Sequence, residues 1–74
     1  MTGKEVRRIR EDLNMSREDL MALLCMSTYN SIMNIETDYR NPGKLVIRLL
    51  RYIDSLPKTK AKLFIEEFKR HDSK

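Results

Sequence analysis

Two asparagines, a tyrosine and a methionine surround a pair of isoleucines that are spaced three residues apart. The polar and soft side chains are Tyr29, Asn30, Met33 and Asn34, and the isoleucines are Ile32 and Ile35. If the isoleucines face the interior of a short helix, the other four side chains remain on its outer surface. An Asn amide can pair with the N6 and N7 atoms of adenine in the major groove, and Met can touch the methyl group of thymine. The stretch therefore has the composition that a DNA recognition helix requires, although the same groups could form an ordinary solvated helix face.

This helix is expected to be the second of two closely spaced helices within residues 16–36. Ser16 is a suitable N-cap for the first of them, with Asp19 three residues further on. Residues 25–27 interrupt the helical spacing of the apolar residues, and Ser27 is expected to cap the second helix. Two short helices joined by a tight break are the frame that would present the asparagines.

A helix is also expected before this pair. Thr2 and Glu5 have the spacing of a capping box, in which the Thr hydroxyl accepts from an N-terminal amide and the Glu reaches back. The helix should run to about Leu13, and Asn14 can adopt the left-handed conformation that ends it.

Two helices are expected after the pair. Asn41 as a cap and Pro42 as the first helical position predict a fourth helix over about 42–55. Pro57 ends that pattern, and a fifth helix should follow from about residue 58 to residue 70. No window alternates with period two, so the sequence predicts an all-α fold of five helices.

The length and composition limit the class of protein. Seventy-four residues with 41% hydrophobic content suffice for one small domain with one core. The one cysteine cannot form an internal disulfide, and no run of 18 apolar residues occurs, so we expect a cytoplasmic protein without a membrane segment. No carboxylate pair, Cys–His constellation, metal-ligand spacing or Gly-rich loop is present, so we expect no enzyme activity, cofactor, metal or small-molecule ligand.

The positive charge is distributed unevenly along the chain. Residues 58–74 hold six Lys/Arg against three Asp/Glu, whereas residues 1–57 hold nine against eight. The candidate recognition helix has no Lys or Arg between positions 28 and 37. The net charge of +4 therefore supports nucleic-acid binding only weakly by itself.

An ordered set of residues spread over positions 2–56 carries a resemblance to a known family. The set includes Ile9-Arg10, Leu13, Ser16, Leu20, Leu23-Leu24, Met26-Ser27, Ile32, Ile35-Glu36, Arg40, Pro42 and Leu49-Leu50. In these residues the chain resembles the Cro/repressor-type helix-turn-helix family, also called XRE-like. The resemblance implies a DNA-binding domain over 1–56, with the helix-turn-helix at about 16–36, and a C-terminal helix and tail over 57–74 in the same domain.

The family resemblance also implies an ion pair between Arg10 and Glu36, which would join the first helix to the third. The family prefers Gly where Cys25 stands and often has Gly where Asp38 stands. A left-handed conformation is therefore expected at both, with a strain of about 1 kcal/mol at Cys25. The segment between Met26 and Ile32 is one residue longer than in the family, and this shifts the start of the recognition helix.

The resemblance and the helix faces together assign candidate roles. Base contacts are expected from Thr28, Tyr29, Asn30, Met33 and Asn34, and phosphate contacts from Arg17, Ser27, Thr37, Arg40, Asn41 and Lys44. Surplus apolar positions are expected to form a homodimer interface: Leu45, Tyr52, Leu56, Leu63 and Phe68. Two recognition helices in a two-fold dimer would lie about 34 Å apart and bind an inverted repeat in double-stranded DNA.

The leading hypothesis is a dimeric repressor or autorepressor of a small phage-type operon. Family members of this size include Cro-like proteins, restriction-control proteins and anti-CRISPR-associated regulators, which act in the bacterial cytoplasm or nucleoid. The alternative is an antitoxin-type module whose main role is to bind a toxin protein through the fifth helix.

Overall fold

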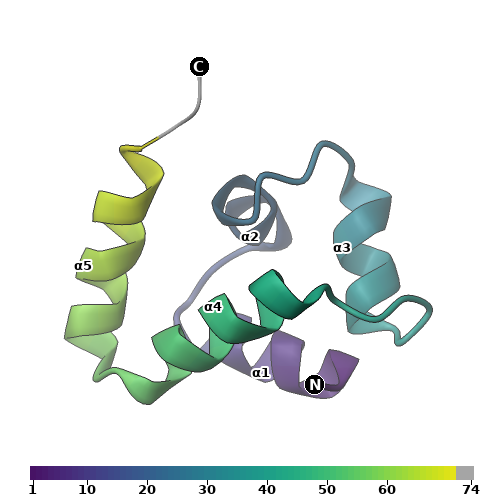
Figure 1. Ribbon diagram of the computed structural model, residues 1–74, viewed down its shortest axis with the longest axis horizontal. Helices are drawn as coiled ribbons and strands as arrows, with labels where there is room; N and C mark the ends of the chain where they lie inside the picture. Colours follow the sequence, from purple (N-terminus) through teal and green to yellow (C-terminus); the bar gives the residue numbers. More distant parts are fainter. Residues whose placement is uncertain (72–74) are drawn as a thin grey trace.

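The computed structural model describes residues 1–71, which form five α-helices and no strand (Figure 1). The helices are α1 (Gly3–Asp12), α2 (Arg17–Leu23), α3 (Tyr29–Glu36), α4 (Lys44–Ser55) and α5 (Lys58–Lys69). The expected all-α class is confirmed, while residues 72–74 of the expected tail lie outside the described residues. Within residues 1–71, no helix combines the length and apolarity that crossing a bilayer would take.

The first two helices begin where the sequence predicts. The Thr2 hydroxyl accepts a hydrogen bond from the Glu5 amide at 3.2 Å. Ser16 Oγ accepts from the Asp19 amide at 3.0 Å, and Asp19 Oδ2 accepts from the Ser16 amide at 3.1 Å. The full capping box, with bonds in both directions, is therefore present at Ser16. At Thr2 the described residues show only the bond from the Glu5 amide, without a return bond from the Glu5 side chain.

The predicted starts of α3 and α4 are wrong by one and two residues. The N-cap of α3 is Thr28 instead of Ser27, and its hydroxyl lies 2.8 Å from Ser31 Oγ instead of capping a backbone amide. The N-cap of α4 is Gly43, so Asn41 and Pro42 precede the helix. Pro42 is buried in the loop before α4, although its ring would suit a first helical position.

Three residues adopt the left-handed conformation directly after helices. They are Asn14 (φ 55°), Cys25 (φ 56°) and Asp38 (φ 63°), as expected at all three positions. Asp38 also joins two helices, because its Oδ1 accepts a hydrogen bond from the Gly3 amide at 2.7 Å. The turn after α3 thus caps the beginning of α1.

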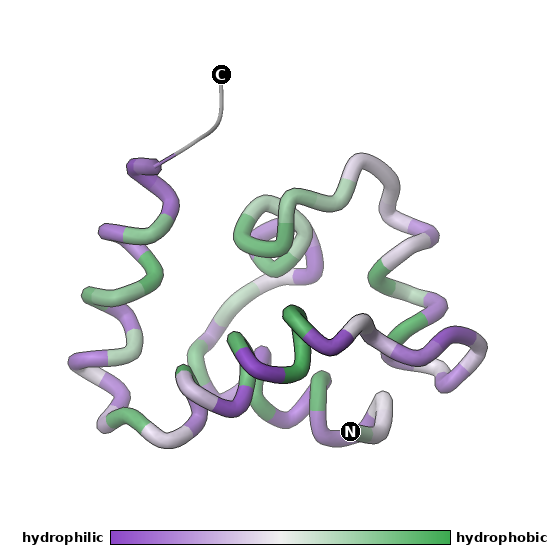
Figure 2. Tube along the Cα trace, viewed as in Figure 1, coloured by the Kyte–Doolittle hydropathy of each residue, from purple (hydrophilic) through white to green (hydrophobic). Residues whose placement is uncertain are grey.

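All five helices contribute to one hydrophobic core. Its buried members are Val6, Ile9, Leu13, Leu20, Leu23, Ile32, Ile35, Leu50, Ile53, Ala61 and Ile65. α3 packs against α1 and α2, and α4 packs against α1 and α5. In α3 the hydrophobic positions face the rest of the molecule and hydrophilic positions lie on the outside (Figure 2). The core therefore fixes which side of α3 is presented to solvent.

Candidate nucleic-acid interface

The two isoleucines of α3 are inside, as the sequence predicts. Ile32 is 0% exposed and Ile35 is 6% exposed. On the other side of the helix Asn30 is exposed, while Met33 and Asn34 are partly exposed. The outer surface of α3 therefore carries two amides and a thioether that solvent or a ligand can reach.

The carboxylate of Glu36, at the end of α3, is enclosed by arginines. Arg10 Nε donates to Glu36 Oε2 at 2.8 Å, and Arg10 Nη2 lies 3.4 Å from Oε1. Arg17 Nε donates to Oε1 at 3.1 Å, and Arg7 Nε lies 3.6 Å from the same oxygen. The pair implied by the family resemblance is thus present, together with two further arginines that sequence reasoning did not connect to Glu36.

The Glu36 side chain is 0% exposed, so its charge depends on these partners. Burial by itself would raise the pKa of Glu36, but hydrogen bonds from Arg10 and Arg17 outweigh it and the pKa is lowered. Arg10 also donates from Nη1 to the Met15 carbonyl at 2.9 Å, in the connection between α1 and α2. One buried carboxylate therefore joins α1, α2 and α3.

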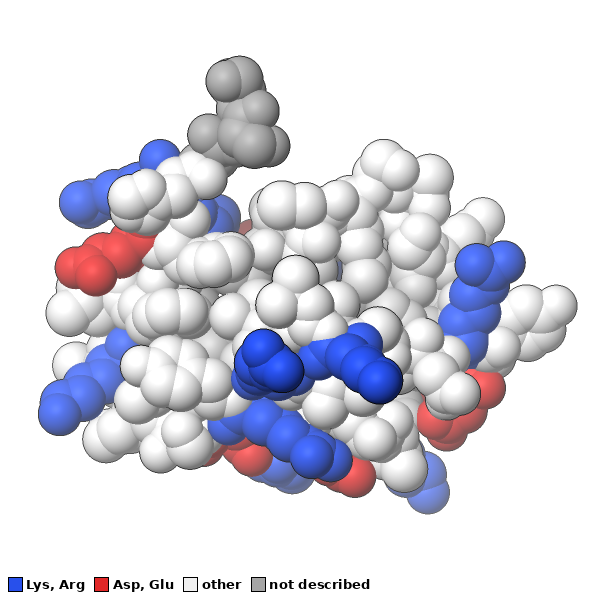
Figure 3. Space-filling model, in the orientation of Figure 1, with Lys and Arg blue, Asp and Glu red and all other residues white. Residues whose placement is uncertain are grey.

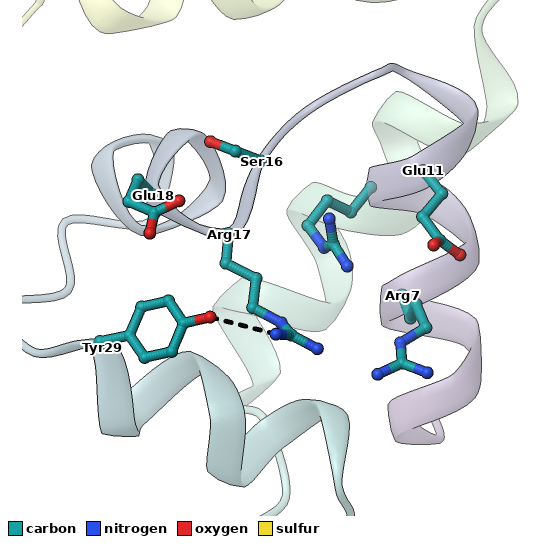
Figure 4. Close-up of a pocket in the computed structure, with 7 residues that line it drawn as sticks. Arg7, Glu11, Ser16, Arg17, Glu18 and Tyr29 are labelled. Carbon is teal, nitrogen blue, oxygen red and sulfur yellow. Dashed lines mark hydrogen bonds between the residues drawn. The ribbon is translucent and has the colours of Figure 1, made fainter.

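The position of Arg17 differs from its expected role as a phosphate contact. Its guanidinium is bonded to Glu36, and its Nη1 also donates to the Tyr29 hydroxyl at 3.1 Å. Figure 4 shows the Tyr29 ring pointing toward Arg17, across the space between α2 and α3. The hydrogen bond to Arg17 thus directs the Tyr29 hydroxyl toward α2.

Two hollows flank α3. The first has a volume of about 310 Å³ and is lined by Arg7, Arg10, Glu11, Ser16, Arg17, Glu18 and Tyr29 (Figure 4). The second has a volume of about 340 Å³ and is lined by Thr28, Asn30, Ser31, Asn34, Ile35, Arg40, Asn41, Pro42 and Gly43. Tyr29 and Ser31 are 200° apart on a helix, so the hollows lie on different sides of α3. The exposed face of α3 forms the ridge between them.

The expected contact residues are divided between these regions. Thr28, Asn30, Asn34, Arg40 and Asn41 line the second hollow together. Ser27 and Lys44 are exposed and are the chain neighbours of Thr28 and Gly43, which line this hollow. Thr37 is also exposed, and its hydroxyl donates to the Met33 carbonyl at 2.8 Å. Five of the eleven predicted contacts thus share one concave surface.

Four of the five expected dimer residues are exposed. Leu45 is 76% exposed, and Tyr52, Leu63 and Phe68 are 51%, 56% and 42% exposed. Leu56 differs, because it is only partly exposed and packs against the core beside the turn into α5. The ring centroids of Tyr52 and Phe64 are 5.2 Å apart, and those of Phe64 and Phe68 are 5.6 Å apart. We call Tyr52, Phe64 and Phe68 the aromatic face.

Comparisons of the chain with protein-family models, with curated proteins and with solved structures found no match. Within residues 1–71, no group of three or more His, Cys, Asp or Glu side chains could hold a metal ion. The groups that this surface offers are amides, hydroxyls and guanidinium groups. These are the groups that form hydrogen bonds with base edges and phosphates.

Proposed function

We propose that this protein is a sequence-specific DNA-binding regulator with a Cro/repressor-like helix-turn-helix, formed by α2 and α3. The observation that supports the proposal most is the burial of Ile32 and Ile35, which leaves Asn30 and Asn34 on the accessible side of α3. In this proposal α3 lies in the major groove and its amides contact base edges. The buried ion pair between Arg10 and Glu36 keeps α3 at a fixed angle to α1.

The base contacts follow from the chemistry of the outer face. Asn30 and Asn34 can each form a bidentate pair with adenine, and each such pair discriminates against a wrong base by about 1–3 kcal/mol. Met33, between them on the surface, can contact a thymine methyl group. If this face of α3 made no base contacts, the protein would bind duplexes of all sequences alike.

The phosphate contacts come from the wall of the second hollow and from its surroundings. Arg40 and Asn41 line that hollow with Asn30 and Asn34, so a phosphate bound there would lie beside the bases that α3 contacts. Lys44 follows at the start of α4. Arg17 instead positions α3, since its guanidinium is bonded to Glu36 and to the Tyr29 hydroxyl.

We further propose that two copies associate through the aromatic face, Leu45 and Leu63. Exposed apolar side chains on α4 and α5 favour burial against a partner surface. A two-fold dimer would present two α3 helices to an inverted repeat, and the protein would act as a repressor or autorepressor of a small phage-type operon by covering the operator. Sedimentation at micromolar concentration should give twice the mass of the chain, and a monomer would contradict the dimer.

The same exposed surface supports the alternative, an antitoxin-type module that binds a toxin protein. A monomer that forms a tight complex with a toxin protein encoded beside it, and that keeps this complex after Asn30→Ala/Asn34→Ala, would favour that function.

Selection of bound duplexes from a random pool tests the DNA-binding proposal. The wild-type protein should enrich an inverted repeat, the Asn30→Ala/Asn34→Ala variant should not, and Thr59→Ala on the exposed side of α5 should behave like the wild type. No enrichment by the wild type, or equal enrichment by the double variant, would contradict base recognition by α3.

A further inference from the structure

One segment that contains most of α4 carries positive charge without any acidic residue. Residues 39–53 hold four cationic side chains, Arg40, Lys44, Arg48 and Arg51, and no acidic residue. The other eleven Lys and Arg residues are equal in number to the eleven Asp and Glu residues, all of which lie outside this segment. The segment therefore has a formal charge of +4 with no acidic residue, whereas the excess of three in residues 58–74 includes three acidic residues.

Four arginines outside this segment are paired with carboxylates. Arg7, Arg10 and Arg17 share the Glu36 carboxylate, and Arg8 Nη2 lies 2.9 Å from Asp54 Oδ2. Within residues 1–71, none of the four cations of the segment forms an ion pair, and all four are exposed. Their charge is therefore available to a ligand.

Three of the four cations lie on one side of α4 and the fourth lies in the loop before it; we call the four together the α4 ridge. Lys44, Arg48 and Arg51 follow one another at spacings of four and three residues, so they share one side of α4 over about 10 Å. Arg40 precedes them in the wall of the second hollow, beside Asn30 and Asn34. Figure 3 shows Lys and Arg side chains gathered over α4. The ridge thus begins next to the proposed recognition surface and leads away from it.

We propose that the α4 ridge is a second phosphate-binding surface, on which Arg48 and Arg51 hold the DNA backbone beyond the stretch that α3 contacts. The proposal rests on the proposed DNA-binding function. A DNA strand carries one charge per nucleotide, so a ridge about 10 Å long can contact more than one phosphate of the same strand. A guanidinium binds a phosphate through two parallel N–H groups, which suits Arg48 and Arg51 to this role.

Two features favour a nucleic-acid backbone over an acidic protein as the ligand. The ridge carries one sign of charge without interruption, which corresponds to the uniform charge of a strand, and it continues directly from the hollow beside α3.

The salt dependence of binding to a duplex of scrambled sequence, about 24 base pairs long, tests the proposal, since phosphate contacts do not depend on sequence. Arg48→Gln/Arg51→Gln should reduce the slope of log K against log salt by about 1.8, or 0.9 for each lost contact. The matched control is Lys60→Gln/Lys62→Gln, which removes the same charge from exposed positions of α5. The control should change the slope by less than about half a unit, and Arg48→Lys/Arg51→Lys should restore most of the wild-type slope.

An unchanged slope in Arg48→Gln/Arg51→Gln, or equal losses in the two glutamine pairs, would overturn the ridge proposal. If the ligand of the ridge were an acidic protein, the slope measured with DNA would be unchanged in Arg48→Gln/Arg51→Gln. The Asn30→Ala/Asn34→Ala variant separates this proposal from the proposed function. It should keep the wild-type slope on the scrambled duplex, and if it also keeps full selectivity among sequences, base recognition by α3 fails while the ridge result stands. A wild-type protein that binds no duplex overturns both.

Discussion

Arg10 and Glu36 are bonded through Nε and Oε2 at 2.8 Å, although the two residues are 26 positions apart. The bond joins α1 to the C-terminal end of α3, and Arg17 from α2 donates to the other oxygen of the same carboxylate. The direction in which α3 presents its outer face therefore depends on one buried charge and its partners.

Replacing that charge should destabilise the fold. Glu36→Gln leaves Arg10 without a charged partner at a site where its side chain is only 11% exposed. The free energy of unfolding should fall by about 3 kcal/mol, as is usual when one member of a buried pair is removed. Urea denaturation measures this loss. Glu67→Gln, at an exposed position of α5, is the control and should change stability by less than about 0.5 kcal/mol.

The same carboxylate should make stability depend on pH. The pKa of Glu36 is lowered in the folded protein, so its contribution is fully present above the unfolded value of about 4.3 and is lost as the pH falls through the folded pKa. The pKa values of Asp19 and Asp54 are also lowered and act in the same direction. The informative quantity is therefore the difference between wild type and Glu36→Gln, which should shrink below about pH 4 in thermal unfolding. A constant difference from pH 7 to pH 3 would contradict this assignment.

Gly3 should tolerate no side chain. A Cβ atom at this position would overlap the Glu36 carbonyl oxygen and lie 2.7 Å from that of Ile35, where α1 meets α3. Gly3→Ala should lower the free energy of unfolding by about 1–3 kcal/mol, because backbone must move to make room. Gly43→Ala is the matched control, since no atom lies within 4 Å of its Cβ position. If both variants unfold at the same urea concentration, the close approach of α1 to α3 is not present in solution.

Two neighbouring residues of the second hollow should affect DNA binding in different ways. Asn34→Ala should relax the preference at one base pair by about 1–3 kcal/mol and leave binding to scrambled duplexes unchanged. Arg40→Ala should weaken binding to all duplexes alike and reduce the salt slope by about 0.9. Fluorescence anisotropy on duplexes with single-base changes distinguishes the two outcomes. Identical behaviour of both variants would mean that α3 does not recognise bases.

Local signals in the sequence predicted much of the fold. The caps at Thr2 and Ser16 and the inward isoleucines follow from residue type and spacing, which act within one or two helical turns. The predicted starts of α3 and α4 were wrong by one and two residues: the N-caps are Thr28, whose hydroxyl contacts Ser31, and Gly43, which follows the buried Pro42.

The candidate site was less predictable than the fold. The pair between Arg10 and Glu36 could be expected from the family resemblance, but the additional bonds of Arg17 and Arg7 to Glu36 join helices that no sequence spacing relates. The sequence predicts Arg17 as a phosphate contact, and nothing in the sequence indicates its bonds to Glu36 and Tyr29. The clustering of net charge in residues 39–53 was present in the sequence, and it becomes informative once the acidic partners of the other arginines are known.

Amide chemical shifts of the protein, measured while a duplex from the random-pool selection is added, test most directly whether the outer face of α3 contacts DNA. We expect the largest shifts from Thr28 to Thr37 and at Arg40, with smaller shifts along the α4 ridge and none on the outer side of α5. Shifts concentrated on α5, with α3 unchanged, would contradict it.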